Sequence, residues 1–226
     1  EERAALWEEV GSAVGGVSAA LLGFSHPAAH KEFAWDLRRC EEVIAARAAD
    51  VAAERRLLLD GFLEGYRRLV VPLLPQLRTS VAHNDPNDYN LVVGADGRVG
   101  VLDFGDMIHT YTCADPAICM AYLLFHCPED APLAESVVPF VRRFHERCPL
   151  DEAELDALFG LAVMRVCTSV CMSAYQSKLE PDNEYLLISA KPAWALLERL
   201  ARESAEEGAP ALLRQACSLP PPGQRG

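Results

Sequence analysis

Several features that would assign the chain to a membrane or to an oxidising compartment are absent from its sequence. No run approaches the ~20 consecutive apolar residues that a membrane-spanning helix needs. The first residues, Glu1-Glu2-Arg3, lead into an amphipathic pattern instead of the apolar core of a signal peptide. None of the eight cysteines belongs to a Cys-x-x-Cys pair. We therefore expect a reduced, cytoplasmic protein without a disulfide framework, a zinc site or a membrane contact.

Basic residues are in the minority. The chain has 21 lysines and arginines against 33 aspartates and glutamates, a formal net charge of −12. Nucleic-acid-binding proteins carry basic patches, so this balance argues against a nucleic-acid partner. Solubility explains most of the acidic residues, and an acidic cleft would also attract a cationic small-molecule substrate. The 226 residues, half of them hydrophobic, suit one domain or one large lobe.

Strands are scarce, and most of the chain has the apolar periodicity of helices. One apolar face is predicted at Leu6, Val10, Val14, Val17 and Leu21, although three glycines interrupt that segment. Further helical patterns cover residues 37–44, 57–69, 117–125, 137–144, 151–174 and 192–200. The segment before His83 is helical and contains no Gly-x-Gly-x-x-Gly sequence. The fold class is therefore α+β, mostly α.

The clearest strand pair lies in the middle of the chain. Residues 90–93 and 98–102 are rich in branched apolar side chains, and a glycine-containing turn at 94–97 joins them, so we predict a β-hairpin. A hairpin brings its open ends together, and these ends are Asn90 and Asp103. Both supply hard oxygen ligands of the kind that Mg²⁺ takes, with water and phosphate completing the shell. Asp85 lies on the loop that enters the same end.

The ordered set of Asp85, Asn90 and Asp103 matches the aspartate, asparagine and Asp-Phe-Gly positions of phosphoryl-transfer enzymes. The run His83-Asn84-Asp85 resembles the catalytic loop of small-molecule kinases of the aminoglycoside-phosphotransferase type. Together with residues 87–90 and 102–107 it resembles the hydroxylysine kinases and their bacterial relatives, some of which are fused to aminotransferases. The chain lacks the arginine of the His-Arg-Asp sequence, so it is less similar to protein kinases.

This resemblance implies a kinase-like C-terminal lobe over residues 1–206, with the N-terminal lobe absent. Because that lobe supplies the Gly-rich loop and the strand lysine, we expect residues 1–226 alone to be inactive. A hypothesis from another class is a non-catalytic interaction domain beside a fused aminotransferase. For the kinase hypothesis, the expected partner is an upstream N-lobe or a fused aminotransferase domain. Residues 207–226 are expected to form a disordered tail. Pro181 to Tyr185 is expected to begin a further helix.

The resemblance also implies an activity. GTP or ATP would donate the γ-phosphate, Asp85 would be the catalytic base, and Asn90 and Asp103 would hold Mg²⁺. The best single acceptor is 5-hydroxylysine, with an aminoglycoside, choline or homoserine as alternatives. Three further candidates for binding the acceptor's ammonium groups are Asp36, Asp88 and Asp106.

Other polar residues have mainly structural interpretations. Asp36 and Asp115 each precede an apolar helical segment and are predicted to be helix N-caps. His26 and His30 are spaced as metal ligands on a helix, but no third ligand is near and caps or surface positions are the default. Arg165 lies in an apolar helix and needs a partner, for which an acidic residue near the active site is a candidate.

Overall fold

The structure is a computed structural model of the chain, and it describes residues 2–181, 183 and 190–218. Helices dominate these residues, as predicted. The helices are α1 (Glu2–Leu21), α2 (Cys40–Arg47), α3 (Ala53–Leu69), α4 (Ala114–Leu123), α5 (Leu133–Ser136), α6 (Val138–Arg147), α7 (Glu152–Leu179), α9 (Ala190–Glu203) and α10 (Ala205–Ser218). The strands are β1 (Thr79–Ala82), β2 (Leu91–Val93), β3 (Val99–Val101) and β4 (Ile108–Tyr111).

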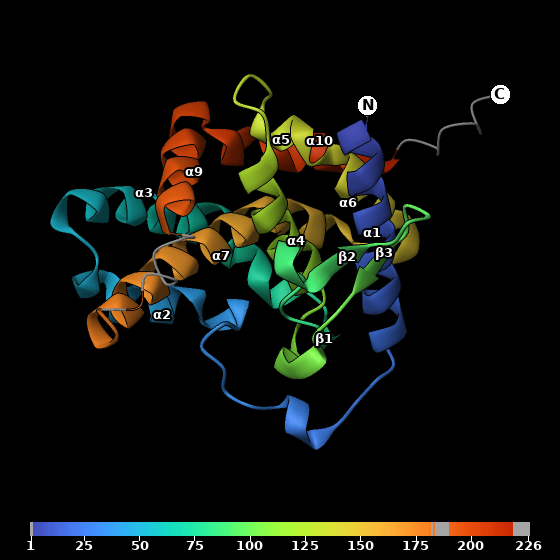
Figure 1. Cartoon of the computed structure of the whole chain (residues 1–226), viewed down its shortest axis with the longest axis horizontal. Coiled ribbons are helices and arrows are strands. Elements are labelled where there is room, and N and C mark those ends of the chain that lie inside the picture. The colour runs from blue at the N-terminus through green and yellow to red at the C-terminus, as the bar shows by residue number, and fades with distance from the viewer. Residues whose placement is uncertain (1, 182, 184–189, 219–226) are drawn as a thin grey trace.

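Helix α7 runs through the middle of the molecule, and α2, α3, α4, α9 and α10 pack against it (Figure 1). Its start is fixed by a capping box. The Asp151 carboxylate accepts the backbone N–H of Glu154, and the Glu154 carboxylate accepts the N–H of Asp151. The helix predicted over residues 151–174 is confirmed, and the other helices named above pack around it.

The expectation that no segment is apolar enough to span a membrane needs a correction at α7. By length and composition this helix could cross a bilayer, but 89% of its most apolar stretch is buried inside the protein. A central helix covered on all sides is apolar all round for the same reason as a membrane helix. The neighbouring helices therefore account for its apolar surface.

Two glycines let α1 approach α6 closely. A Cβ atom added to Gly11 would lie 2.4 Å from the Phe140 carbonyl oxygen, and one added to Gly15 would lie 2.9 Å from the Arg147 Cβ. These glycines, which interrupt the apolar pattern of α1, are thus its packing surface. The buried face is centred on Trp7, Val10, Val14 and Ser18, whereas Leu6 is 39% exposed.

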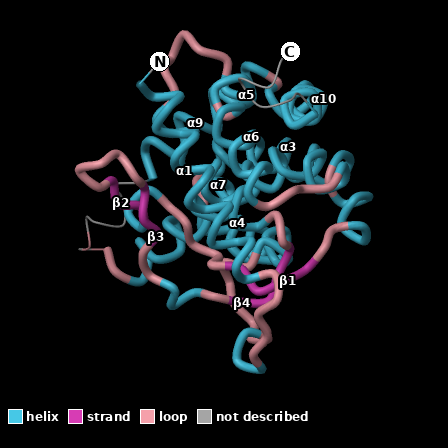
Figure 2. Tube along the Cα trace, turned by 90° about the vertical axis from the view of Figure 1, so that its right-hand side faces the viewer, coloured by secondary structure: helices cyan, strands magenta, loops and turns pink. Residues whose placement is uncertain are grey.

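The strands form two separate antiparallel pairs (Figure 2). The β2–β3 pair is the predicted hairpin, with Leu91 opposite Val101 and a turn in which Gly97 has a φ of +78°. The β1–β4 pair, with Thr79 opposite Tyr111, was not predicted. Its strands are four residues long and 25 residues apart, so no local turn signal announces their pairing. In the sequence, β1 precedes and β4 follows the segment that contains the hairpin. The described residues thus form two strand pairs, where a single hairpin was expected.

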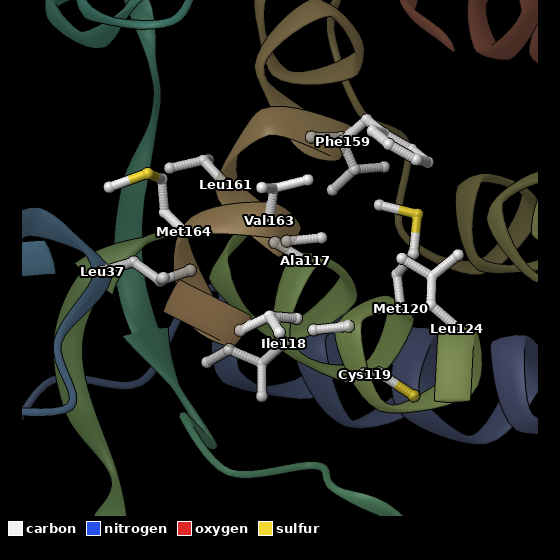
Figure 3. Close-up of a cluster of buried hydrophobic side chains, with 14 of the residues drawn as sticks. Leu37, Ala117, Ile118, Cys119, Met120, Leu124, Phe159, Leu161, Val163 and Met164 are labelled. Atoms are coloured by element: carbon white, nitrogen blue, oxygen red, sulfur yellow. The ribbon is translucent and has the colours of Figure 1, made fainter. Parts of the chain in front are cut away.

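The hydrophobic core includes buried side chains from nearly every helix, and α4 and α7 both contribute to it. Figure 3 shows Ala117, Ile118 and Met120 of α4 facing the same cluster as Phe159 and Val163 of α7. All eight cysteines are free, and six of them are buried. Helix α4, which begins just after β4, packs mainly against α7.

The C-terminal boundary predicted from composition was wrong in part. Residues 207–218 belong to helix α10, where Ala209 and Leu213 are buried, although Gly208 and Pro210 had suggested the start of a tail. An amphipathic face packed on α5, α6 and α7 outweighs these two unfavourable residues. The rest of the expected tail, 219–226, lies outside the described residues, as does most of the helix start expected at 181–185.

The α1–α6 contact gives a test with a control on the same helix. Gly11→Ala should lower the free energy of unfolding by about 1–3 kcal/mol, because the new methyl group meets backbone that cannot move aside. Gly16→Ala should raise it by about 0.5–1 kcal/mol, because its Cβ would have no neighbour closer than 3.7 Å. Urea denaturation followed by circular dichroism measures both, and equal effects of the two changes would contradict the packing described.

Candidate active site

A buried carboxylate holds the loop of residues 83–90, which we call the site loop. Asp115, 1% exposed in the first turn of α4, accepts the backbone N–H groups of His83 (3.1 Å) and Asn84 (2.8 Å) and the hydroxyl of Ser18 (3.1 Å). The prediction that Asp115 caps α4 was wrong, because Cys113 occupies the N-cap position. The carboxylate satisfies the loop's backbone instead, and so joins α1, α4 and the site loop.

His83 connects the site loop to the end of the hairpin. Its Nδ1 accepts the N–H of Asp85 (3.2 Å), so its Nε2 carries the proton and donates it to the carbonyl oxygen of Leu102 (2.8 Å). Its ring also meets that of Phe104 edge-on, with centroids 4.7 Å apart. The histidine therefore fixes the position of Asp103, between Leu102 and Phe104, relative to Asp85.

Two non-glycine residues at the site have left-handed backbone conformations. Asn84 has a φ of +68° and Asp103 a φ of +56°. Asparagine and aspartate tolerate this region better than most residues, but it still costs free energy that the surroundings must offset. The Asp115 bond to the N–H of Asn84 provides part of that support. Such strain, held by its surroundings, is typical of functional sites.

Asp85 lies at the centre of a hydrogen-bond network. Its Oδ2 accepts the side-chain amides of Asn87 (2.9 Å) and Asn90 (3.0 Å). Its Oδ1 accepts Nη2 of Arg165 at 2.9 Å. Burial raises the pKa of the Asp85 carboxyl above its usual value, while the positive charge of Arg165 opposes that rise. The carboxyl group is thus partly desolvated and lies beside a fixed positive charge.

Asn90 and Asp103, the predicted metal ligands, lie at the open end of the β2–β3 hairpin. The amide nitrogen of Asn90 is turned to Asp85, which leaves its Oδ1 with no partner among the described residues. Asp103 uses Oδ1 to accept the N–H of Gly105 and leaves Oδ2 similarly open. The N–H of Leu102 bonds the carbonyl of Asn90, so Asp103 follows directly after the residue paired with Asn90.

An asparagine and one aspartate make a sparse ligand set. In the part of the chain that the structure describes, no three His, Cys, Asp or Glu side chains are grouped as a metal site. A sparse set suits Mg²⁺, which keeps several water or phosphate oxygens in its shell. His26 and His30 do not contribute: His26 accepts the N–H of Ala28, and His30 stacks on His109.

The Asp85 network opens into a cavity of about 580 Å³. Its lining combines carboxylates, aromatic rings and small polar groups: Trp35, Asp85, Asn87, Asp88, Tyr89, Asp106, Tyr122, Phe125, His126, Arg165, Ser169, Ser173, Gln176 and Pro192. Asp88 and Asp106, two of the predicted ammonium-binding residues, are therefore here with Asp85. Asp88 also pairs with Nε2 of His126 at 3.1 Å.

Asp36, the third predicted ammonium-binding residue, does not line this cavity. It is 2% exposed, and its oxygens bond Thr110 (2.6 Å) and the guanidinium of Arg38 (2.7 Å). It also accepts the backbone N–H of Arg38, so the predicted capping role is confirmed for the 3₁₀ turn Leu37–Arg39 that leads into α2. Its neighbour Trp35 is the residue that reaches the cavity.

Several residues of the site were not predicted from the sequence, and Arg165 was predicted only in part. Arg165 was recognised as needing an acidic partner, and that partner is Asp85. Tyr122 and His126 gave no signal of their own, because each lies in or directly after a segment with an ordinary helical pattern. Only the packing of α4 and α7 beside the site loop brings these side chains to the same cavity.

The chain matches known proteins in sequence. Residues 1–147 match the model of the phosphotransferase enzyme family. The chain is 34% identical to hydroxylysine kinase of Danio rerio over 149 residues, covering 63% of this chain and 41% of the relative. It is 29% identical to hydroxylysine kinase of Mus musculus over 206 residues, covering 85% and 54% respectively. It thus spans about half the length of the curated relatives that it matches.

Solved structures share the fold. A microcompartment-associated aminopropanol kinase aligns with a TM-score of 0.64 at 18% identity, over 88% of this chain and 63% of that one. Amicoumacin kinase hAmiN, solved in complex with AMP-PNP and Ca²⁺, aligns with a TM-score of 0.58 at 17% identity, over 92% and 60%. At these identities the likeness is one of fold.

Asp115→Ala tests the anchor of the site loop. Two buried N–H groups and one hydroxyl would lose their acceptor, at about 1–3 kcal/mol for each unsatisfied group, so the free energy of unfolding should fall by roughly 2–4 kcal/mol. Asp130→Ala, at an exposed loop position, is the matched control and should change it by less than about 0.5 kcal/mol. Similar values for the two variants in urea denaturation would show that Asp115 does not hold the loop.

Proposed function

The chain belongs to the phosphotransferase enzyme family, and we propose that the protein transfers the γ-phosphate of GTP or ATP to a hydroxyl group of a small cationic amino-alcohol. The observation that carries this proposal is the carboxylate of Asp85, held by Arg165, Asn87 and Asn90 at the wall of a cavity that also contains Asp88 and Asp106. The acceptor named by the curated relatives, hydroxylysine, is our first choice.

Asp85 would act on the acceptor hydroxyl. An ionised carboxylate offers about four acceptor positions, and Arg165, Asn87 and Asn90 fill three of them. The remaining position is on Oδ1. It would take the hydroxyl proton while the hydroxyl oxygen forms a bond to the γ-phosphorus. The bond from that phosphorus to the β,γ-bridging oxygen breaks, and the nucleoside diphosphate leaves.

Asn90 and Asp103 would hold Mg²⁺ through the oxygens that the described residues leave open. The ion would neutralise negative charge on the transferring phosphate. The protein's own share of the chemistry is mainly positioning. His83 contributes to it by tying the Asp85 backbone to the carbonyl of Leu102, next to Asp103.

The cavity lining favours a cationic acceptor. Asp88 and Asp106 add negative charge beside Asp85, and Trp35, Tyr122 and Phe125 present aromatic rings to the same space. Carboxylates and aromatic faces both attract ammonium groups. The net charge of −12 supports the same choice, because it raises the local concentration of cations.

Asp85→Asn in the full-length natural protein should lower kcat by about 10²–10⁴-fold, because the amide cannot accept the proton. The KM of the nucleotide should stay within about threefold, because a general base acts in the transition state and does not bind the nucleotide. The measurement is nucleoside diphosphate release with 5-hydroxylysine and a panel containing choline, homoserine and an aminoglycoside. Asp96→Asn, in the exposed hairpin turn, is the control. An unchanged kcat in Asp85→Asn would contradict the assigned base.

Asp106→Asn tests the choice of acceptor. Loss of this charge should raise the KM of a cationic acceptor by roughly 10-fold, since a hydrogen-bonded charge contributes about 1.5–3 kcal/mol, while the KM of the nucleotide changes little. Initial rates with 5-hydroxylysine over a range of concentrations give both constants. A selective rise in the nucleotide KM would instead assign Asp106 to the metal–phosphate side of the site.

A further inference from the structure

Arg165 is a buried charge at the centre of the molecule. It lies on α7 and is only 3% exposed. Most of the residues next to it along this helix are apolar. Its Nη2 donates to Asp85 Oδ1 (2.9 Å), and its Nη1 donates to the carbonyl oxygen of Trp35 (3.1 Å). Its guanidinium also lies 4.6 Å from the centre of the Trp35 ring.

This arrangement is costly if it serves stability alone. Burying an ion pair is often no better than burying apolar side chains of the same volume. Nε of Arg165 is buried and has no partner among the described protein atoms, which adds to that cost. The aliphatic stem of a methionine would fill most of the space without these penalties. The placement of the guanidinium against Asp85 therefore points to a function.

The contacts define what that function is. Asn87 and Asn90 hold one oxygen of Asp85, and both belong to the site loop itself. Arg165 holds the other oxygen and comes from α7, 80 residues later in the chain. Without Arg165, the carboxylate could rotate with the loop amides, and nothing from the helical core would fix the direction of Oδ1. The contact with the Trp35 ring and the bond to the Trp35 carbonyl in turn help to hold the guanidinium in place.

We propose that Arg165 is a positioning residue, which fixes the Asp85 carboxylate so that the open acceptor position of Oδ1 faces the acceptor hydroxyl in the cavity. This inference rests on the proposed phosphotransferase function. Arg165 itself takes no proton and contacts no reacting atom. Its effect on the rate passes entirely through Asp85.

The test uses the full-length natural protein with Arg165→Met, Arg165→Lys, Asp85→Asn and the double variant Asp85→Asn/Arg165→Met. Misplacement of a reacting group by about 1 Å costs ~10²-fold, so Arg165→Met should lower kcat by about that factor with little change in the KM of the nucleotide. Arg165→Lys should restore part of the loss, because it keeps one donor and the charge. The double variant should be no slower than Asp85→Asn alone, since Arg165 acts through Asp85.

Arg199→Met is the matched control. Arg199 is equally buried (5% exposed) and bonds Glu203 and the carbonyls of Cys127 and Ala131, but it does not line the cavity. Its loss should lower the melting temperature and leave kcat of the folded enzyme within about threefold, as expected for a structural change remote from the reacting groups. An Arg165→Met variant that behaves like Arg199→Met, or a further loss of rate in the double variant, would overturn the positioning role.

A second readout separates this inference from the proposed function. The coupling between Asp85→Asn and Arg165→Met in urea denaturation measures the pair without any substrate. Strong coupling in a wild-type protein that phosphorylates no acceptor would refute the phosphotransferase and, with it, the positioning role, while confirming the ion pair. An active wild type in which Asp85→Asn is slow and Arg165→Met is not would leave the function standing and refute the inference alone.

Discussion

The buried carboxylate of Asp115 is the interaction on which the site depends most. It belongs to the first turn of α4, whose apolar side chains are embedded in the core against α7. Through three hydrogen bonds it attaches α1 and the site loop to that core. A loop of polar residues has little apolar surface to bury, so it needs such an attachment to keep one conformation. The bond from the N–H of Asn84 to this acceptor provides part of the support for the strained backbone of Asn84.

A second attachment comes from α7. Arg165 bonds the oxygen of Asp85 that the loop's own asparagines do not, so the carboxylate is held between the site loop and α7. His83 then links Asp85 to the carbonyl before Asp103. Asp85, the proposed proton acceptor, and Asp103, a proposed metal ligand, are thus held by one network of hydrogen bonds. Phosphoryl transfer asks for this kind of positioning more than for covalent chemistry.

The sequence predicted the local part of this site and missed the distant part. Asp85, Asn90 and Asp103 lie within 19 residues, and a hairpin readable from glycine and branched residues brings them together. Arg165 and Trp35 join them only through the packing of α7 and the connector before α2, which no periodicity specifies. Asp115 was mistaken for a cap because its role depends on backbone groups 31 and 32 positions away. Likewise, the glycines of α1 are explained only by their close contact with α6, which the sequence pattern does not show.

The most direct measurement is a structure of the full-length protein with a non-hydrolysable nucleoside triphosphate, Mg²⁺ and 5-hydroxylysine. The account predicts the acceptor hydroxyl within about 2.6–3.2 Å of Asp85 Oδ1, with Arg165 still on the same carboxylate. It also predicts the oxygens of Asn90 and Asp103 on the metal, and the acceptor's ammonium group toward Asp88 or Asp106. An acceptor bound outside this cavity, or a phosphate on the far side of Asp85, would contradict it.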